Sequence, residues 1–193
     1  MAIADFSRET VGEFPGAWKP KDEAGRGVYR VMEEQGLRFL RAQARESGVP
    51  AGLQIDTWDL NTHPVLAWRW RPLEFPRGAD ERRGRRNDSA LGVYAVFPHP
   101  VTARSLKYVW SAAAPVGTEF DASLGLTHGR VLRTGPATAG RWYEERVNVR
   151  DDFRRRFGDE VPRPVGIGVL TDADATSGMA RGDYGDFRVC REG

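Results

Sequence analysis

Cysteine is almost absent from this chain of 193 residues, with Cys190 as its single example. No intrachain disulfide is therefore possible, and the lone thiol, near the end of the last predicted strand, is expected to be a bystander. A chain of this length buries enough surface to fold without disulfides or metals. We expect one domain spanning residues 1–193.

Long apolar runs are also missing. No segment approaches the roughly 18 apolar residues that a membrane-spanning helix needs, so no transmembrane segment is expected. The chain opens with MAIADFSRE and is already polar by Asp5, which is unlike a signal peptide.

Charge of one sign does not dominate either: 29 basic residues face 27 acidic ones, for a formal net charge of +2. The cations are mostly arginine and are scattered among acidic residues. The densest basic run, 79–89, is itself flanked by Asp80, Glu81 and Asp88. Nucleic-acid binding proteins gather cations on one face, so nucleic acid is not expected as a partner.

Helical periodicity is nearly absent, and short segments rich in Val, Tyr, Trp and Phe recur instead. Several of them alternate with period two, which is typical of strands. These observations predict an all-β fold, an antiparallel β-sandwich of the jelly-roll kind. One short helix is expected near 150–157, where VRDDFRRRFG places acidic residues first, arginines later and glycine at the end. The predicted strands lie within 27–32, 37–43, 64–72, 90–97, 105–111, 129–135, 141–149, 165–170 and 186–190.

Alternation within these segments predicts which side chains enter the core. In LAWRWRP, Trp68 and Trp70 share one face, and Arg69 and Arg71 share the other. SLKYVWS alternates in the same way, with Lys107 opposite the aromatic residues. Large aromatic side chains on apolar faces usually pack inside. The predicted core residues are Trp68, Trp70, Tyr108 and Trp110.

The segment 141–149 predicts a ligand-binding face. An indole can stack on the apolar face of a sugar while carboxylate, guanidinium and amide groups bind its hydroxyls. If this strand lies beside the one that carries Arg69 and Arg71, the two form a polar groove. The alternative is an exposed strand face with compensating charges. The side chains that share the face are Trp142, Glu144, Arg146 and Asn148.

An acidic segment, TDADATSGMARGDYGDFRV at 171–189, contains a candidate metal site. Calcium takes six to eight oxygen ligands with flexible geometry, and short carboxylates near turns can supply them. The segment lacks the EF-hand pattern, and its aspartates can equally cap turns. The three histidines are far apart in sequence, so no zinc site is expected. The candidate calcium ligands are Asp172, Asp174, Asp183 and Asp186.

Several segments in a fixed order resemble a bacterial family of domains of unknown function, number 3047. They are FPGAWKPK, GVYRV, LAWRWRP, the ADER…NDSALGVYAVF block, SLKYVWS, and the run from VRDDFRRRFG through TDADAT to DYGDF. The resemblance extends from about Phe14 to Val189. It implies a periplasmic or secreted protein if a signal peptide was removed, and a cytoplasmic one otherwise. In general form the chain is also similar to carbohydrate-binding and galactose-binding sandwich modules.

These features favour a non-catalytic module that binds a carbohydrate or another small polar ligand, with a structural calcium ion. The first alternative is a hydrolase or lyase acting on polysaccharide, which would need carboxylates such as Glu144 and Asp80 to act together. Neighbours such as Glu144 and Glu145 point to opposite faces of a strand and cannot flank one bond. The second alternative is a structural or protein-interaction domain.

Overall fold

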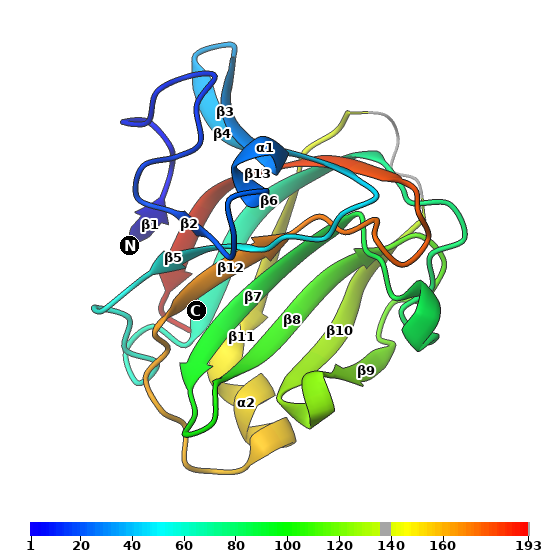
Figure 1. Cartoon of the computed structure of the whole chain (residues 1–193). Helices are drawn as coiled ribbons and strands as arrows, with labels where there is room; N and C mark the ends of the chain where they lie inside the picture. The colour runs from blue at the N-terminus through cyan, green and yellow to red at the C-terminus, as the bar shows by residue number, and fades with distance from the viewer. Residues whose placement is uncertain (136–139, 193) are drawn as a thin grey trace.

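Two β-sheets packed face to face make up most of the molecule (Figure 1). The computed structural model describes residues 1–135 and 140–192. The six-stranded sheet has the order β11 (Tyr143–Asn148), β6 (Val65–Glu74), β13 (Met179–Cys190), β4 (Leu37–Arg45) and β3 (Tyr29–Glu34), with β1 (Ala2–Ala4) also pairing with β13. The seven-stranded sheet has the order β2 (Lys19–Pro20), β5 (Ala51–Gln54), β12 (Gly166–Leu170), β7 (Leu91–Pro98), β8 (Ala103–Ser111), β10 (Thr127–Thr134) and β9 (Glu119–Ala122).

The predicted β-sandwich is confirmed, and each of the nine predicted segments contains a strand. The sheets are not purely antiparallel, because β8 and β10 pair in parallel through a connection that includes β9 and the short 3-10 helix Ser123–Gly125. Four strands were not predicted: β1, β2, β5 and β9 have two to four residues each, too few to display an alternating pattern.

The last strand differs most from the prediction. β13 begins at Met179 and not at 186, so the second half of the acidic segment is strand and not turn. Its residues 179–184 pair with β4, and the strand continues beside β6 with a bulge at Asp186, where φ is +52°. Asp183, which the prediction placed before the strand, therefore lies within it, opposite Arg41 in β4 and Arg71 in β6.

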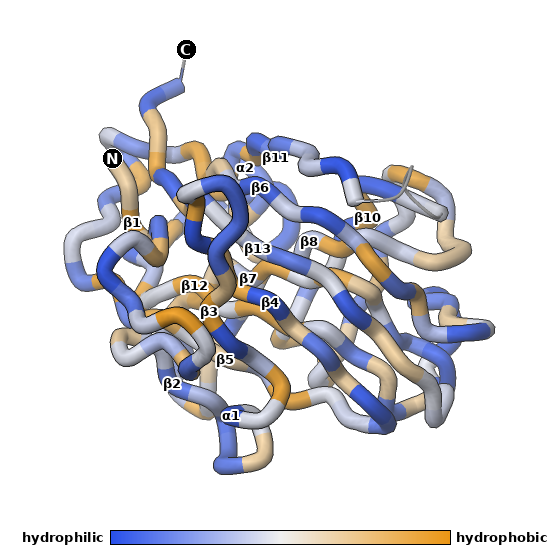
Figure 2. Tube along the Cα trace, turned by 90° about the horizontal axis from the view of Figure 1, so that it is seen from above, coloured by the Kyte–Doolittle hydropathy of each residue, from blue (hydrophilic) through white to orange (hydrophobic). Residues whose placement is uncertain are grey.

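The core lies between the sheets and is built from apolar side chains of both. Figure 2 shows apolar residues (orange) interspersed with polar ones (blue) along the chain. Trp68, Trp70, Tyr108 and Trp110 are all at most 3% exposed, which confirms the predicted core. The Trp68 and Trp70 rings meet edge to face at 5.3 Å, a favourable arrangement for aromatic pairs. Because alternate residues point to opposite faces, burying these rings directs the intervening charged side chains outward.

Helix α2 (Val149–Phe157) confirms the predicted helix and closes one end of the sandwich (Figure 1). The Asn148 side chain accepts a hydrogen bond from the Asp151 backbone N–H and so caps its first turn. Gly158, with φ +104°, ends it. Phe153 anchors it on Phe97 with a ring separation of 4.5 Å. A second short helix, α1 (Gly25–Val28), precedes β3, and Gly84–Arg86 form a 3-10 turn. Among the described residues, no helix has the length and hydrophobicity to cross a membrane.

Candidate functional site

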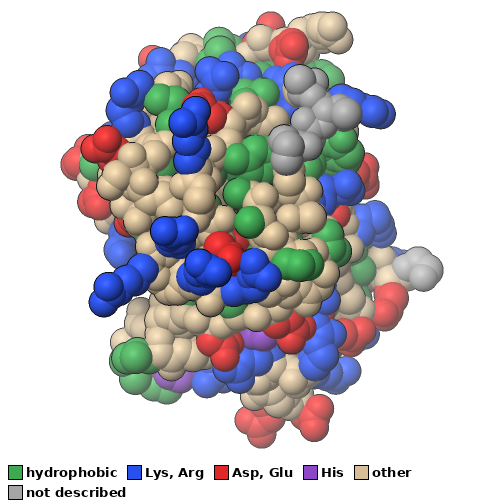
Figure 3. All heavy atoms as spheres, turned by 90° about the vertical axis from the view of Figure 1, so that its right-hand side faces the viewer, with side chains coloured by type: hydrophobic (Ala, Val, Ile, Leu, Met, Phe, Trp, Pro, Cys, Tyr) green, Lys and Arg blue, Asp and Glu red, His purple; other side chains and the backbone are tan. Residues whose placement is uncertain are grey.

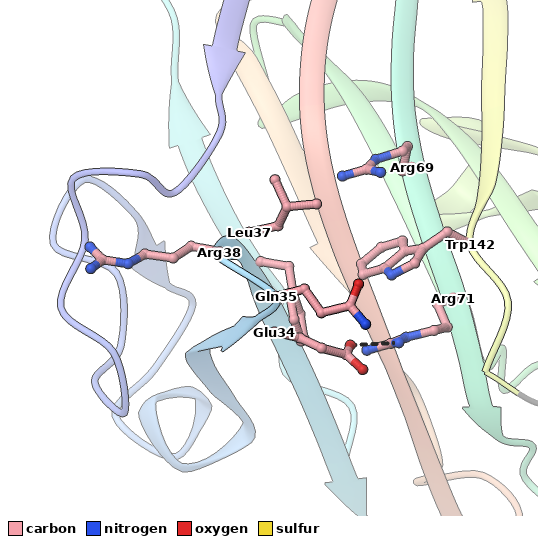
Figure 4. A pocket seen from close by; sticks show the side chains of 8 residues that line it. Glu34, Gln35, Leu37, Arg38, Arg69, Arg71 and Trp142 are labelled. Carbon is pink, nitrogen blue, oxygen red and sulfur yellow. Dashed lines mark ion pairs between the residues drawn. The ribbon is translucent and has the colours of Figure 1, made fainter.

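The outer face of the six-stranded sheet has a pocket lined by three of the six predicted ligand residues, Trp142, Arg69 and Arg71. β11 pairs with β6, so that Glu144 lies opposite Arg69, and the condition set for a groove between these two strands is met. Trp142, just before β11, extends over the sheet between Arg69 and Arg71 (Figure 4). The cavity beside it measures about 180 Å³ and is lined by Glu34, Gln35, Leu37, Arg38, Phe39, Arg69, Arg71 and Trp142.

The polar groups around Trp142 are already paired with one another. Arg71 contacts Asp183 at 2.7 Å and Glu34 at 2.8 Å, and Arg69 contacts Asp186 at 2.6 Å. The guanidinium carbons of Arg71 and Arg69 lie 4.8 and 5.2 Å from the Trp142 ring centre. Phe39 meets the indole edge to face at 5.4 Å. Together these contacts form a compensated surface in which a ligand would have to displace existing partners.

Three other predicted ligand residues lie along β11 and do not line this pocket. Glu144 pairs with Arg188 at 2.9 Å, and an Arg146 N–H points at the Cys190 sulfur at 3.8 Å. Asn148 caps α2, and its amide also donates to Glu192 at 2.7 Å. The strand carries them away from Trp142 toward the helix, where each has a structural partner.

The four predicted metal ligands separate into two pairs. Asp183 is fully buried, accepts hydrogen bonds from Arg41 and Arg71, and raises the pKa of Arg41 through that contact. Asp186 pairs with Arg69 on the same face. The structure therefore does not bring these two residues to Asp172 and Asp174, because β13 is a strand at that point.

The outer face of the seven-stranded sheet is hollowed, in contrast to the paired surface around Trp142. One row of residues runs across its strands in register: Lys19 in β2, Gly52 in β5, Gly168 in β12, Tyr94 in β7 and Lys107 in β8. Residues directly opposite each other in antiparallel strands point to the same face. The two neighbouring glycines, Gly52 and Gly168, thus leave a gap beside Tyr94. We call this hollow the trough.

The trough has a volume of about 530 Å³, within the usual range for ligand pockets. Tyr94 is half-buried in it, and the Ser105 and Thr127 hydroxyls hydrogen-bond each other at 2.9 Å on its wall. Among the described residues, the only charged side chains that line it are two lysines. Its lining comprises Lys19, Lys21, Gly48, Pro50, Ala51, Gly52, Tyr94, Val96, Thr102, Ala103, Ser105, Ser123, Thr127, Ile167, Gly168 and Leu170.

Lys107 lies next to Tyr94 at the floor of this face and is only 6% exposed. Its ammonium is 5.6 Å from the centre of the Tyr94 ring. Burial alone would lower the pKa of Lys107, but the neighbouring Tyr94 and Asp172 outweigh it, and the net pKa is raised. Burial raises the pKa of Tyr94, while Lys107 acts against this. Lys107 is therefore cationic and Tyr94 a neutral phenol at neutral pH.

Three carboxylates meet at one end of the trough, behind Gly48. Oxygens of Asp88, Asp172 and Asp174 lie within 4.8 Å of one another, and these three are the one such group among the described residues. Gly48 permits this approach, because a Cβ there would stand 2.1 Å from the Asp172 Oδ1. The pKa of Asp172 is raised to about 6, chiefly by burial and also by the neighbouring Asp174 and Asp88, whereas Lys107 acts in the opposite direction.

The three carboxylates differ in the hydrogen bonds that they accept. Asp88 is buried and accepts hydrogen bonds from the backbone N–H groups of Ala175 and Thr176 at 3.0 and 2.9 Å. Asp172 is 8% exposed, and its Oδ1 is buried without a hydrogen-bond partner. Such a group is costly to bury unless something else neutralises it.

Sequence reasoning missed the trough, although the sequence contains a signal for it. In VGIGVL, Gly166 and Gly168 occupy the positions opposite the core-facing residues Ile167 and Val169. Glycine inside a strand often marks a place where a ligand or another backbone approaches closely. The same reading of AGLQ would have identified Gly52, but only the sheet order places these glycines beside Tyr94.

The class of the protein follows from the fold. It is a β-sandwich similar to the family 11 carbohydrate-binding module of the cellulosomal cellulase Lic26A-Cel5E of Clostridium thermocellum, with 7% identity, a TM-score of 0.51, and coverage of 100% of this chain and 94% of that one. It is also similar to the non-crystalline-cellulose-specific module CBM28 (11% identity, TM-score 0.49, coverage 98% and 94%). The family 12 endoglucanase 3 of Trichoderma harzianum is similar as well (10% identity, TM-score 0.48, coverage 94% of each chain).

The chain belongs to the family described as protein of unknown function (DUF3047), whose model matches residues 17–188. The resemblance found in the sequence is thereby confirmed. No curated protein matches the chain.

Proposed function

We propose that this protein is a carbohydrate-binding module and that its saccharide lies in the trough of the seven-stranded sheet. The observation that carries the proposal is the open cavity of about 530 Å³ beside Tyr94, floored by Gly52 and Gly168. An aromatic ring with glycines next to it offers an apolar surface for a sugar ring, and the wall hydroxyls of Ser105 and Thr127 can bind sugar hydroxyls.

The composition of the trough favours binding without catalysis. Hydrolysis of a glycosidic bond usually requires two carboxyl groups that flank the bond. Among the described residues, no acidic side chain lines the trough. The carboxylates considered from the sequence have other partners, since Asp80 pairs with Arg82 at 2.7 Å and Glu144 pairs with Arg188.

The pocket at Trp142, which the sequence favoured, is the competing location for the same ligand. It has about one third of the volume of the trough, and its arginines are paired. Glycan-array screening followed by calorimetry on Tyr94→Ala and Trp142→Ala separates the two sites. We expect Tyr94→Ala to weaken binding of the best array hit at least tenfold and Trp142→Ala to change it less than twofold. The reverse result moves the site to Trp142, and the lack of any glycan hit refutes the proposed function.

We further propose that Asp88, Asp172 and Asp174 hold a calcium ion that stabilises the end of the trough. The proposal is supported by the unpartnered, buried Oδ1 of Asp172 within a group of three carboxylates. Oxygen ligands of this kind suit a hard cation, and backbone carbonyls and water would complete its shell.

Melting curves test the calcium proposal independently of any saccharide. After treatment with a chelator, adding calcium at about a hundredfold excess over its Kd should raise the melting temperature by about 5–10 °C. Asp174→Asn, at an exposed position of the group, should remove most of this rise. Asp159→Asn, an exposed aspartate elsewhere, is the matched control and should retain it. A melting temperature that calcium leaves unchanged refutes the site.

A further inference from the structure

The charges around the trough differ from those on the rest of the surface. Elsewhere, arginines lie beside carboxylates, and Figure 3 shows blue basic side chains interspersed with red acidic ones on one such face. The trough is lined by two lysines and by no arginine and no acidic residue among the described positions. Because no carboxylate forms an ion pair with either lysine among the described residues, both are available to a ligand.

Lysine is rare in this chain, and its distribution is uneven. The sequence contains only three lysines, Lys19, Lys21 and Lys107. Lys19 and Lys21 line the trough, and Lys107 lies beside Tyr94 on the same face of the sheet. All three lysines are therefore on the face that carries the trough, and two of them line it, whereas arginine provides the paired charges of the opposite face.

Backbone pairing fixes the positions of Lys19 and Lys21, which we call the rim lysines. Lys19 lies opposite Gly52 in the β2–β5 ladder, and the Lys21 N–H donates to the Pro50 carbonyl at 2.9 Å. Both side chains are exposed, and no carboxylate forms an ion pair with either among the described residues. Lys19 and Lys107 are the two ends of the row across the strands. Gly52, Gly168 and Tyr94 lie between them. Since neighbouring strands are about 4.8 Å apart, the backbone positions of these two lysines are roughly 19 Å apart.

We infer that the trough recognises an anionic saccharide, with Lys19 and Lys21 binding acidic groups of a chain that lies across Gly52, Gly168 and Tyr94. This inference rests on the proposed function and specifies its ligand class. Ammonium groups on flexible stems act as point charges and adapt to carboxylate or sulfate groups along a polymer. The acidic cluster lies behind Gly48 and outside the lining, with Asp172 and Asp174 following β12 and Asp88 preceding β7.

Calorimetry with three polymers tests the inference: polygalacturonate, a sulfated galactan and a neutral galactan. The wild-type protein should bind at least one anionic polymer about tenfold more tightly than the neutral one at low salt. Raising the ionic strength to about 0.5 M should remove most of this preference, because exposed charges are screened. The polymer that binds tighter identifies carboxylate or sulfate as the acidic group.

A double variant shows whether the two rim lysines are responsible. Lys19→Gln/Lys21→Gln should weaken binding of the anionic polymer about fivefold or more and leave the neutral galactan unaffected. Arg8→Gln/Arg85→Gln removes the same net charge at two exposed positions away from the lining and should have no effect. If the neutral polymer binds as tightly and the lysine variant changes nothing, the inference is overturned while the proposed function stands. If none of the three polymers nor any array glycan binds, both are refuted.

Discussion

The two outer faces of this sandwich are made from the same kinds of strand but differ in how they treat charge and space. On the six-stranded face, Arg69 and Arg71 pair with Asp186 and Asp183, and Trp142 fills the space between them. On the seven-stranded face, glycines take the corresponding outward positions, and the rim lysines have no ion-pair partner among the described residues. The charged groups of the six-stranded face are paired with one another. The seven-stranded face has a cavity about three times larger than the pocket at Trp142.

The difference shows that conspicuous residues do not by themselves mark a binding site. A tryptophan among arginines attracts attention in a sequence, yet here its neighbours already use its surface. Glycine and lysine attract less attention in a sequence. Here the glycines leave space and the lysines leave uncompensated charge, and a ligand needs both. If this comparison is correct, variants of the six-stranded face should alter stability, and variants of the seven-stranded face should alter binding.

The largest effect on stability is expected from Asp183→Asn. This carboxylate is fully buried and holds both Arg41 and Arg71, so its loss leaves Arg41 without its ion-pair partner and Arg71 with Glu34 alone. Removing one partner of a buried ion pair typically costs about 3–5 kcal/mol. Denaturant unfolding should show this loss, with saccharide affinity unchanged in the folded protein. A cost below about 1 kcal/mol would mean that the face is not held together by this pair.

Two glycines provide a matched pair for binding. Gly168→Val places a side chain in the trough beside Tyr94 and should weaken saccharide binding about a hundredfold by occupying the cavity. Gly185→Val places the same side chain under Trp142 on the other face and should leave affinity within about twofold. Calorimetry on both variants measures this. Equal losses of affinity would show that the effect comes from a general disturbance of the sandwich.

A smaller loss of stability is expected from Gly48→Ala. Its Cβ would lie 2.1 Å from the Asp172 Oδ1, so the carboxylate group must shift. Overpacking of this kind typically costs about 1–3 kcal/mol. The matched control is Gly27→Ala, where no atom lies within 4 Å of the new Cβ. If thermal unfolding shows the same change for both variants, the close approach of Asp172 to Gly48 is not a constraint.

The smallest effect is expected from Glu144→Gln. The pair that this residue forms with Arg188 is exposed, with side chains 47% and 41% accessible, and such pairs contribute about 1 kcal/mol at most. Both stability and saccharide affinity should remain close to wild type. A substantial loss of affinity would return Glu144 to the binding face that the sequence predicted.

Much of the fold could be predicted from the sequence because alternation is local. Trp68 and Trp70 identify the inward face of β6 without any knowledge of its neighbours, and the acidic start and glycine end of α2 identify the helix. The short strands β2 and β5 could not be predicted, since their pairing depends on partners distant in sequence.

The candidate site was less predictable for the same reason. The pairing of β11 with β6 was considered only as a condition, and the sequence does not reveal that Asp183 lies on a strand where Arg41 and Arg71 enclose it. The row from Lys19 to Lys107 crosses five strands that span most of the first 170 residues. Only the order of the sheet brings it together.

A crystal structure of the protein soaked with an oligosaccharide of the polymer that binds best is the most direct test. The account predicts a sugar ring against Tyr94, over Gly52 and Gly168, with an acidic group of the chain toward Lys19 or Lys21. A sugar ring stacked on Trp142, between Arg69 and Arg71, would contradict it.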